Sequence, residues 1–127
     1  MTPVTGSVRV WLRLEGLAVL AASLFFYQRQ SASWLLLAVL FFAPDLFMLG
    51  YLTGPRIGAA MYNIVHSYLL PLALLLMAIL TAHPALIPYA LIWTAHIGFD
   101  RSLGYGLKYP SAFGDTHLGR LGKQKAV

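Results

Sequence analysis

The sequence predicts an all-α integral membrane protein: a bundle of four antiparallel transmembrane helices with a short cytoplasmic C-terminal tail. Three observations lead to this prediction. Of the 127 residues, 59% are hydrophobic and only 10% are charged, against about 25% charged in ordinary soluble domains. Four apolar stretches are each about long enough to cross a bilayer. The few ionisable residues inside these stretches fall at similar depths.

The four spans are expected at residues 10–28, 34–52, 57–81 and 85–103, with the tail at 104–127. A helix needs about 20 apolar residues to cross the hydrocarbon core. The breaks between the spans are short, and Thr53-Gly54-Pro55-Arg56 has the composition of a tight turn. Because short connections place consecutive helices side by side and antiparallel, the chain 1–127 is expected to form one domain.

Basic residues are distributed unevenly between the two ends of the spans. One end has only Arg29, whereas the other carries Arg9, Arg13, Arg56, Lys108, Arg120, Lys123 and Lys125. Cytoplasmic loops carry the excess of lysine and arginine, so both termini are expected in the cytoplasm, in a bacterial inner membrane. We therefore attribute the net charge of +5 to the orientation of the spans in the membrane. We expect membrane lipids as partners and no nucleic acid, and a homo-oligomer is compatible with the sequence.

Ionisable residues gather in one layer of the predicted bundle. Asp45, His66 and His96 lie about 10–13 Å from the cytoplasmic end of their helices, and Asp100 and Glu15 about 5–8 Å, at 1.5 Å per residue. Charged groups inside spans are costly and usually face the bundle interior at functional sites. Each residue alone is compatible with a structural hydrogen bond, but their shared depth favours a common site.

Residues four apart share a helix face, and two such pairs contribute to this layer. His96 and Asp100 can hold the same metal ion, or the carboxylate can orient the imidazole. Tyr62 and His66 repeat the spacing on the preceding span.

Further residues near this layer are candidates for binding substrate. Arg101 can hold an anionic head group through two parallel hydrogen bonds; the alternative is an interaction with phospholipid phosphates. Glu15 is either an additional ligand or an ion-pair partner of Arg13 or Arg101. The remaining candidates for contact with substrate are Tyr62, Asn63 and Tyr105.

The tail carries two more polar residues in alternation. In an extended stretch Asp115 and His117 point to the same side, where they can supply ligands or an acid–base group. The alternative is a solvated loop. We expect residues 115–119 to fold back under the bundle near Asp100 and Arg101, with His117 as a catalytic candidate beside them.

Four segments resemble the bacterial domain-of-unknown-function (DUF) 4260 family. They are residues 43–51 (APDLFMLGY), 62–68 (YNIVHSY), 96–109 (HIGFDRSLGYGLKY) and 115–119 (DTHLG). The resemblance covers nearly the whole chain, and it implies no established activity.

The chain is more distantly similar to membrane-bound metal-dependent hydrolases. These proteins carry Pro-Asp, Thr-His-Ser and His-x-x-x-Asp in order, matched here by Pro44-Asp45, His66-Ser67 and His96 to Asp100. The similarity implies that Asp45, His66, His96 and Asp100 are metal ligands. The chain departs from the pattern where those proteins have a further Asp-His, so the resemblance does not extend to a second metal.

Our leading functional hypothesis is a metal-dependent hydrolase acting on a lipid or amphiphilic (phospho)ester at the cytoplasmic leaflet. Two carboxylates and two imidazoles suit zinc, manganese or iron. Asp100, Arg101 and His117 are its catalytic candidates. The alternatives are a proton or metal-ion pathway, a haem-binding protein and a structural subunit of a membrane complex. The nearly pure apolar sequence at 17–26 and 69–80 argues against a continuous pathway.

Overall fold

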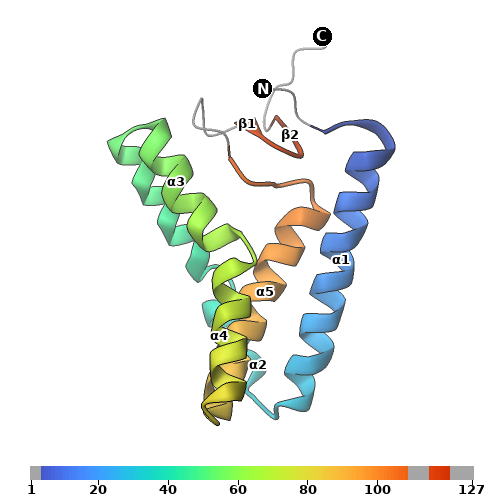
Figure 1. The fold of residues 1–127 in the computed structure, drawn as a ribbon, viewed down its shortest axis with the longest axis vertical. Coiled ribbons are helices and arrows are strands. Elements are labelled where there is room, and N and C mark those ends of the chain that lie inside the picture. Colours follow the sequence, from blue (N-terminus) through green and yellow to red (C-terminus); the bar gives the residue numbers. More distant parts are fainter. Residues whose placement is uncertain (1–3, 109–114, 121–127) are drawn as a thin grey trace.

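A computed structural model describes residues 4–108 and 115–120 of the chain. Most of this part is helical (Figure 1). In chain order the elements are α1 (Gly6–Arg29), α2 (Trp34–Leu40), the 3-10 helix η1 (Ala43–Thr53), α3 (Pro55–His66), α4 (Leu69–Leu80), the 3-10 helix η2 (Pro84–Leu86), α5 (Ile87–Ser102), β1 (Asp115–Thr116) and β2 (Gly119–Arg120).

Three helical stretches are long and apolar enough to cross a membrane: Gly6–Arg29, Trp34–Thr53 and Pro55–Leu80. The chain is therefore a membrane protein, and three of the predicted spans are confirmed by length and composition. The fourth predicted span, 85–103, begins as η2 and continues as α5. This helix has 16 residues and is the most enclosed, since nine of them are buried.

The second and third spans are each interrupted near their middle. Pro44 lies in the first turn of η1, where it has no N–H to continue an α-helical ladder. Pro71 lies in the first turn of α4, and its ring would clash with the carbonyl of residue 67 in a continuous helix. Ser67 accordingly has extended backbone, with φ −91° and ψ 158°. Proline thus explains why each span divides into two helices.

α1 packs along α5, and the contact depends on small residues. A Cβ atom placed on Gly98 would lie 2.7 Å from the carbonyl oxygen of Gly16, so the two backbones are nearly in contact. The hydroxyls of Ser23 and Thr94 share a buried hydrogen bond of 2.7 Å between these helices. Small residues and interhelical hydrogen bonds are the usual means of helix association in membranes.

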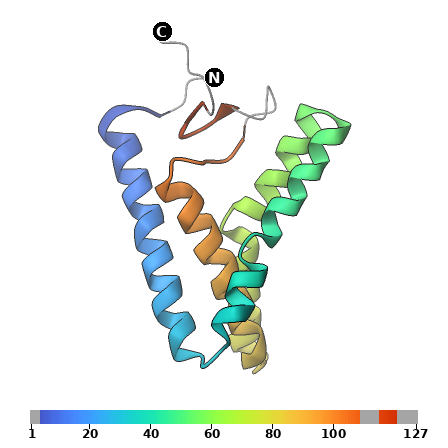
Figure 2. The same ribbon diagram turned by 180° about the vertical axis from the view of Figure 1, so that it is seen from behind.

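The predicted bundle splays into two arms. α1 and α5 form one arm, and η1 packs against α3 in the other. The arms diverge toward the end of the molecule where α1 begins and α5 ends, whereas α2, α4 and the start of α5 meet at the opposite end (Figures 1 and 2). Because the second and third spans are interrupted, η1 and α3 run in a different direction from α2 and α4. In a bundle of straight helices the two halves of each span would run in the same direction.

Candidate metal centre

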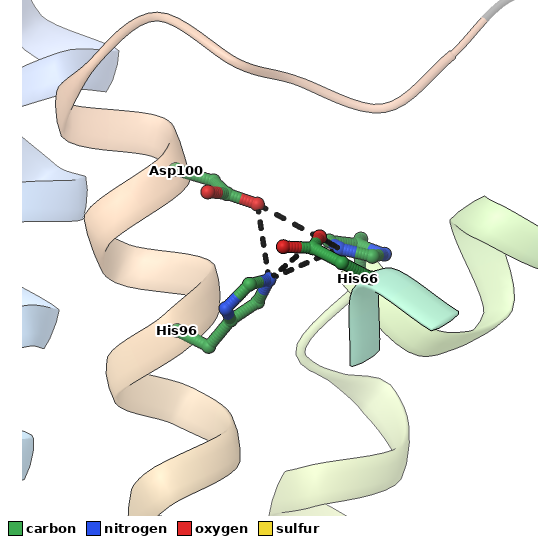
Figure 3. A group of neighbouring side chains, drawn as sticks. His66, His96 and Asp100 are labelled. Atoms are coloured by element: carbon green, nitrogen blue, oxygen red, sulfur yellow. Dashed lines mark hydrogen bonds and ion pairs between the residues drawn. The ribbon is translucent and has the colours of Figure 1, made fainter. Parts of the chain in front are cut away.

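Four side chains converge between the two arms. Asp45, His66, His96 and Asp100 each offer one ligand atom, and these atoms all lie within 4.8 Å of one another. Figure 3 shows the histidines and Asp100 pointing toward a common centre. Asp45 and His66 lie inside two of the three membrane-spanning stretches, where ionisable groups are rare.

The distances within the cluster are short and even. His66 Nε2 lies 3.1 Å from Asp45 Oδ1 and 3.6 Å from Asp100 Oδ2. His96 Nε2 lies 3.2 Å from the same two oxygens. The two Nε2 atoms are 3.1 Å apart. Two ligands of one tetrahedral ion lie about 3.3 Å apart when each bond is about 2.0–2.1 Å long, so these spacings suit a single ion.

The helix interruptions position the four residues. Asp45 lies in the first turn of η1, immediately after the interruption in the second span. His66 is the last residue of α3, immediately before the interruption in the third. His96 and Asp100 lie one turn apart on the enclosed helix α5. The cluster therefore joins both arms at the level where the helices change direction.

One hydrogen bond fixes the tautomer of His66. Its Nδ1 lies 3.0 Å from the carbonyl oxygen of Tyr62, and because a carbonyl oxygen only accepts, Nδ1 must carry the proton. The neutral ring then presents the lone pair of Nε2 to the cluster, as a metal-binding histidine does. That lone pair faces a carboxylate oxygen and a second imidazole nitrogen, an arrangement that a cation at the centre stabilises.

His96 is held differently. Its Nδ1 is buried and has no hydrogen-bond partner among the described residues. The ring instead meets the aromatic rings of Phe41 and Phe42 edge-on, with centroids 5.3 and 6.2 Å away. Packing orients this imidazole, and the hydrophobic surroundings keep water from its outer edge.

Arg101 and Trp93 bind backbone groups that the end of α3 leaves without intrahelical partners. Arg101 Nη2 donates to the carbonyl oxygen of His66 at 3.1 Å. Trp93 Nε1 donates to that of Val65 at 2.7 Å. Arg101, expected to bind substrate, also lies over the ring of Tyr68 at 5.4 Å. Both residues come from α5, so this helix supplies two residues of the cluster and also secures the end of the helix that carries a third.

Tyr62 and Asn63, also expected to contact substrate, have well-defined partners. The ring of Tyr62 is stacked on that of His66, with centroids 3.7 Å apart and an interplanar angle of 5°. The Asn63 amide pairs with the backbone of Lys108: Asn63 Nδ2 donates to its carbonyl oxygen at 2.8 Å, and the Lys108 N–H donates to Asn63 Oδ1 at 2.7 Å. The side chain of Lys108 then lies over the Tyr62 ring at 4.6 Å.

Lys108 is a residue whose position the sequence did not predict. It is only 3% exposed, and this burial lowers its pKa to about 8. In the sequence it is one of several basic residues that follow the last span. Nothing in the spacing of Asn63 and Lys108 marks them as partners, because 45 residues separate them.

Residues 115–120 fold back toward the helices, as expected for residues 115–119. β1 and β2 form an antiparallel hairpin, and Thr116 bridges to Lys108. The backbone N–H of His117 donates to the carbonyl oxygen of Leu107 at 3.0 Å. The hairpin thus docks on the segment that Asn63 holds, at the end of the molecule where the arms diverge (Figure 2).

The remaining site candidates lie outside the cluster of four. His117 Nδ1 accepts a hydrogen bond from the Leu107 N–H at 2.9 Å, and burial, with the charge of Arg101, lowers its pKa. Glu15 is exposed on α1. Tyr105 follows α5 and is exposed, with its N–H donating to the Asp100 carbonyl oxygen at 2.7 Å. The side chain of Asp115 lies outside the described part of the structure.

Membrane-spanning helices and a partly buried cluster of two histidines and two aspartates define a multi-pass membrane protein with a candidate metal centre. The chain belongs to the family described as domain of unknown function (DUF4260), whose profile matches residues 9–121. The resemblance identified from the sequence is thereby confirmed for this family. No curated protein matches the chain, and no solved structure matches it either.

Proposed function

We propose that this protein is a membrane-embedded hydrolase that binds one divalent transition-metal ion and cleaves an ester or phosphoester bond of a lipid or another amphiphile. Asp45, His66, His96 and Asp100 would hold the ion. The observation that carries the proposal is the convergence of their four ligand atoms within 4.8 Å, in a membrane protein that belongs to a family without an assigned activity. This donor set suits zinc, manganese or iron.

The chemistry requires the ion and one water molecule. A bound divalent ion lowers the pKa of water and polarises the bond to be cleaved. The water oxygen is transferred to the acyl carbon or phosphorus, the ester bond breaks, and the leaving oxygen takes up a proton. Asp45 has the more accessible carboxylate of the two, with its side chain 28% exposed against 12% for Asp100.

Arg101 is the residue best suited to orient an anionic substrate. Its guanidinium has five N–H donors, one of which bonds the carbonyl oxygen of His66. A phosphate or carboxylate held by this group would lie beside the proposed ion. We place the reaction at the cytoplasmic leaflet of a bacterial inner membrane, because the excess of arginine and lysine lies at the ends of the spans that adjoin the tail.

One alternative has a specific observation in its favour. The distances of 3.1–3.2 Å between imidazole nitrogens and carboxylate oxygens also suit shared protons, as in a relay. In that case the cluster would hold protons in place of a metal, and the protein would not be a hydrolase.

Metal analysis separates these functions. The protein would be purified in detergent without added metal, and its metal content and absorption spectrum measured together with those of His96→Ala and His83→Ala. His83 is an exposed histidine bound to Thr81, which makes it the matched control. We expect about one transition-metal ion per chain in the wild type and in His83→Ala, and loss of the ion in His96→Ala.

Other results would redirect the assignment. A wild-type protein without transition metal, which also fails to bind added zinc or manganese, would exclude the metal-dependent hydrolase. A Soret band would indicate haem. If the ion is present, hydrolysis of a lysophospholipid in detergent, with and without a chelator, tests whether the centre is catalytic.

A further inference from the structure

An apolar cleft of about 400 Å³ lies beside the cluster. Its walls come from the second and third spans and from α5, and they include Pro44, Val65, Leu70, Ile92 and Trp93. A cavity of this size lies at the lower end of the range for small-molecule sites. Its lining is almost entirely apolar, so the cleft suits a hydrocarbon and offers nothing to a polar ligand.

The cleft and the cluster are built on the same turns of backbone. Pro44 directly precedes Asp45, Val65 directly precedes His66, and Trp93 lies about one helical turn before His96. The lining of the cleft therefore includes residues that lie one to three positions from three of the four proposed ligands.

Two wall residues of the cleft satisfy each other's polar atoms. The indole Nε1 of Trp93 donates to the carbonyl oxygen of Val65 at 2.7 Å, so one bond satisfies the polar atoms of two wall residues. A water molecule needs two to four polar partners to occupy a cavity. A peptide would carry backbone groups with the same requirement. The lining offers too few polar partners for water or for a peptide backbone, whereas a hydrocarbon chain needs none.

The cleft and the cluster are arranged like the two parts of an amphiphile. Leu70 is the residue that α4 contributes to the lining, and α4 extends to the end of the molecule away from the hairpin (Figure 1). Asp100 lies nearer the opposite end, where the hairpin docks. A molecule with its polar linkage at the cluster would direct its chain away from the hairpin, toward the interior of the bilayer.

We propose that the cleft binds the hydrocarbon chain of a single-chain membrane lipid and so selects single-chain lipid substrates. The placement of the polar linkage at the cluster rests on the proposed hydrolase function, whereas the occupation of the cleft by the chain does not. The volume of about 400 Å³ accommodates one chain.

Photo-crosslinking tests this proposal without relying on catalysis. The full-length protein in phosphatidylcholine nanodiscs would be labelled with a lysophosphatidic acid whose palmitoyl chain carries a terminal diazirine. Labelled peptides would be located by mass spectrometry, with and without an excess of unlabelled lysophosphatidic acid. We expect saturable labelling of peptides that line the cleft, and proportional, unsaturable labelling of the lipid-facing surface of α1.

A matched pair of variants on α4 provides the control. Leu70 lines the cleft and is 43% exposed, whereas Leu72 is not among the lining residues and is 52% exposed. Leu70→Trp fills the cleft and should lower its saturable labelling about tenfold, the loss expected when two fewer methylene groups are buried. Leu72→Trp should leave the labelling unchanged. Helix content measured by circular dichroism verifies that both variants fold.

The outcomes separate the two proposals. Labelling of the cleft that is unsaturable, or equally affected by both substitutions, would overturn the cleft proposal. Saturable labelling that survives His96→Ala and a chelator would support the cleft as a chain-binding site but exclude the metal from lipid binding. Saturable labelling that weakens on chelation supports both.

Discussion

The pairing of Asn63 with the backbone of Lys108 should decide whether the C-terminal hairpin stays docked. Asn63→Leu removes two hydrogen bonds, of 2.7 and 2.8 Å, and preserves the approximate shape of the side chain. Each bond contributes about 1 kcal/mol net, and each buried polar group left without a partner costs about 1–3 kcal/mol. The substitution should therefore cost about 2–6 kcal/mol, all of it at the junction between α3 and the segment that supports the hairpin.

Amide hydrogen exchange measures this cost locally. The lower figure of about 2 kcal/mol corresponds to an increase of about thirtyfold in exchange. We expect that increase at the N–H groups of Leu107 and His117. The first donates to His117 Nδ1 and the second to the carbonyl oxygen of Leu107. Exchange within α1 and α5 should stay unchanged. The control is Met61→Leu. Met61 lies on the same helix as Asn63 but packs against Gly50 in η1, so this substitution leaves the pairing with Lys108 in place.

Unchanged exchange at Leu107 and His117 in Asn63→Leu would refute this reasoning. It would mean that the hairpin is held by its other contacts, such as the hydrogen bond from Arg9 to the carbonyl oxygen of Leu118. A loss of helix content throughout the molecule would also refute it, because the cost would then not be confined to the docked segment.

Three further predictions concern the helix contact, the cluster and the buried lysine. Gly98→Ala places a Cβ 2.7 Å from the Gly16 carbonyl oxygen, so unfolding in detergent should require about 1–3 kcal/mol less free energy. Tyr62→Leu removes the ring stacked on His66 and should weaken zinc binding about tenfold by titration, whereas Tyr62→Phe should retain it. Lys108 has its pKa lowered from 10.5 to about 8. The unfolded chain thus binds more protons between these values, and the free energy of unfolding should rise with pH from about 8 to about 10.5; a midpoint near 10.5 in an NMR titration of the Lys108 side chain would contradict this.

The convergence of the cluster could be predicted because depth in a membrane can be counted along a helix. Asp45, His66, His96 and Asp100 were placed in one layer from their distances to the ends of the spans, and the structure brings them within 4.8 Å. The count tolerates the helix interruptions because these lie close to the residues concerned. A lateral position around each helix is harder to predict, and Glu15, at a suitable depth, is exposed on α1.

The change of direction within the spans was not predicted, although Pro44 and Pro71 both mark it. Proline is tolerated in membrane helices when neighbouring groups satisfy the backbone it frees. Here those groups include Trp93 and Arg101, which are distant in sequence from the carbonyl oxygens they bind. The partner of Asn63 could not be predicted either, because it is the backbone of Lys108, 45 residues away. Asn63 was therefore expected to contact substrate.

The enclosure of α5 has a consequence for how the protein assembles. This helix carries His96, Asp100 and Arg101, and residues of the last two types each cost about 2.5–3.5 kcal/mol at the centre of an inserting helix. Among the described helices α5 comes last in chain order, whereas α1, which packs along it, comes first. Nine residues of α5 are buried by the rest of the chain. We therefore expect α5 to be stable in the membrane as part of a pair with α1 and not alone.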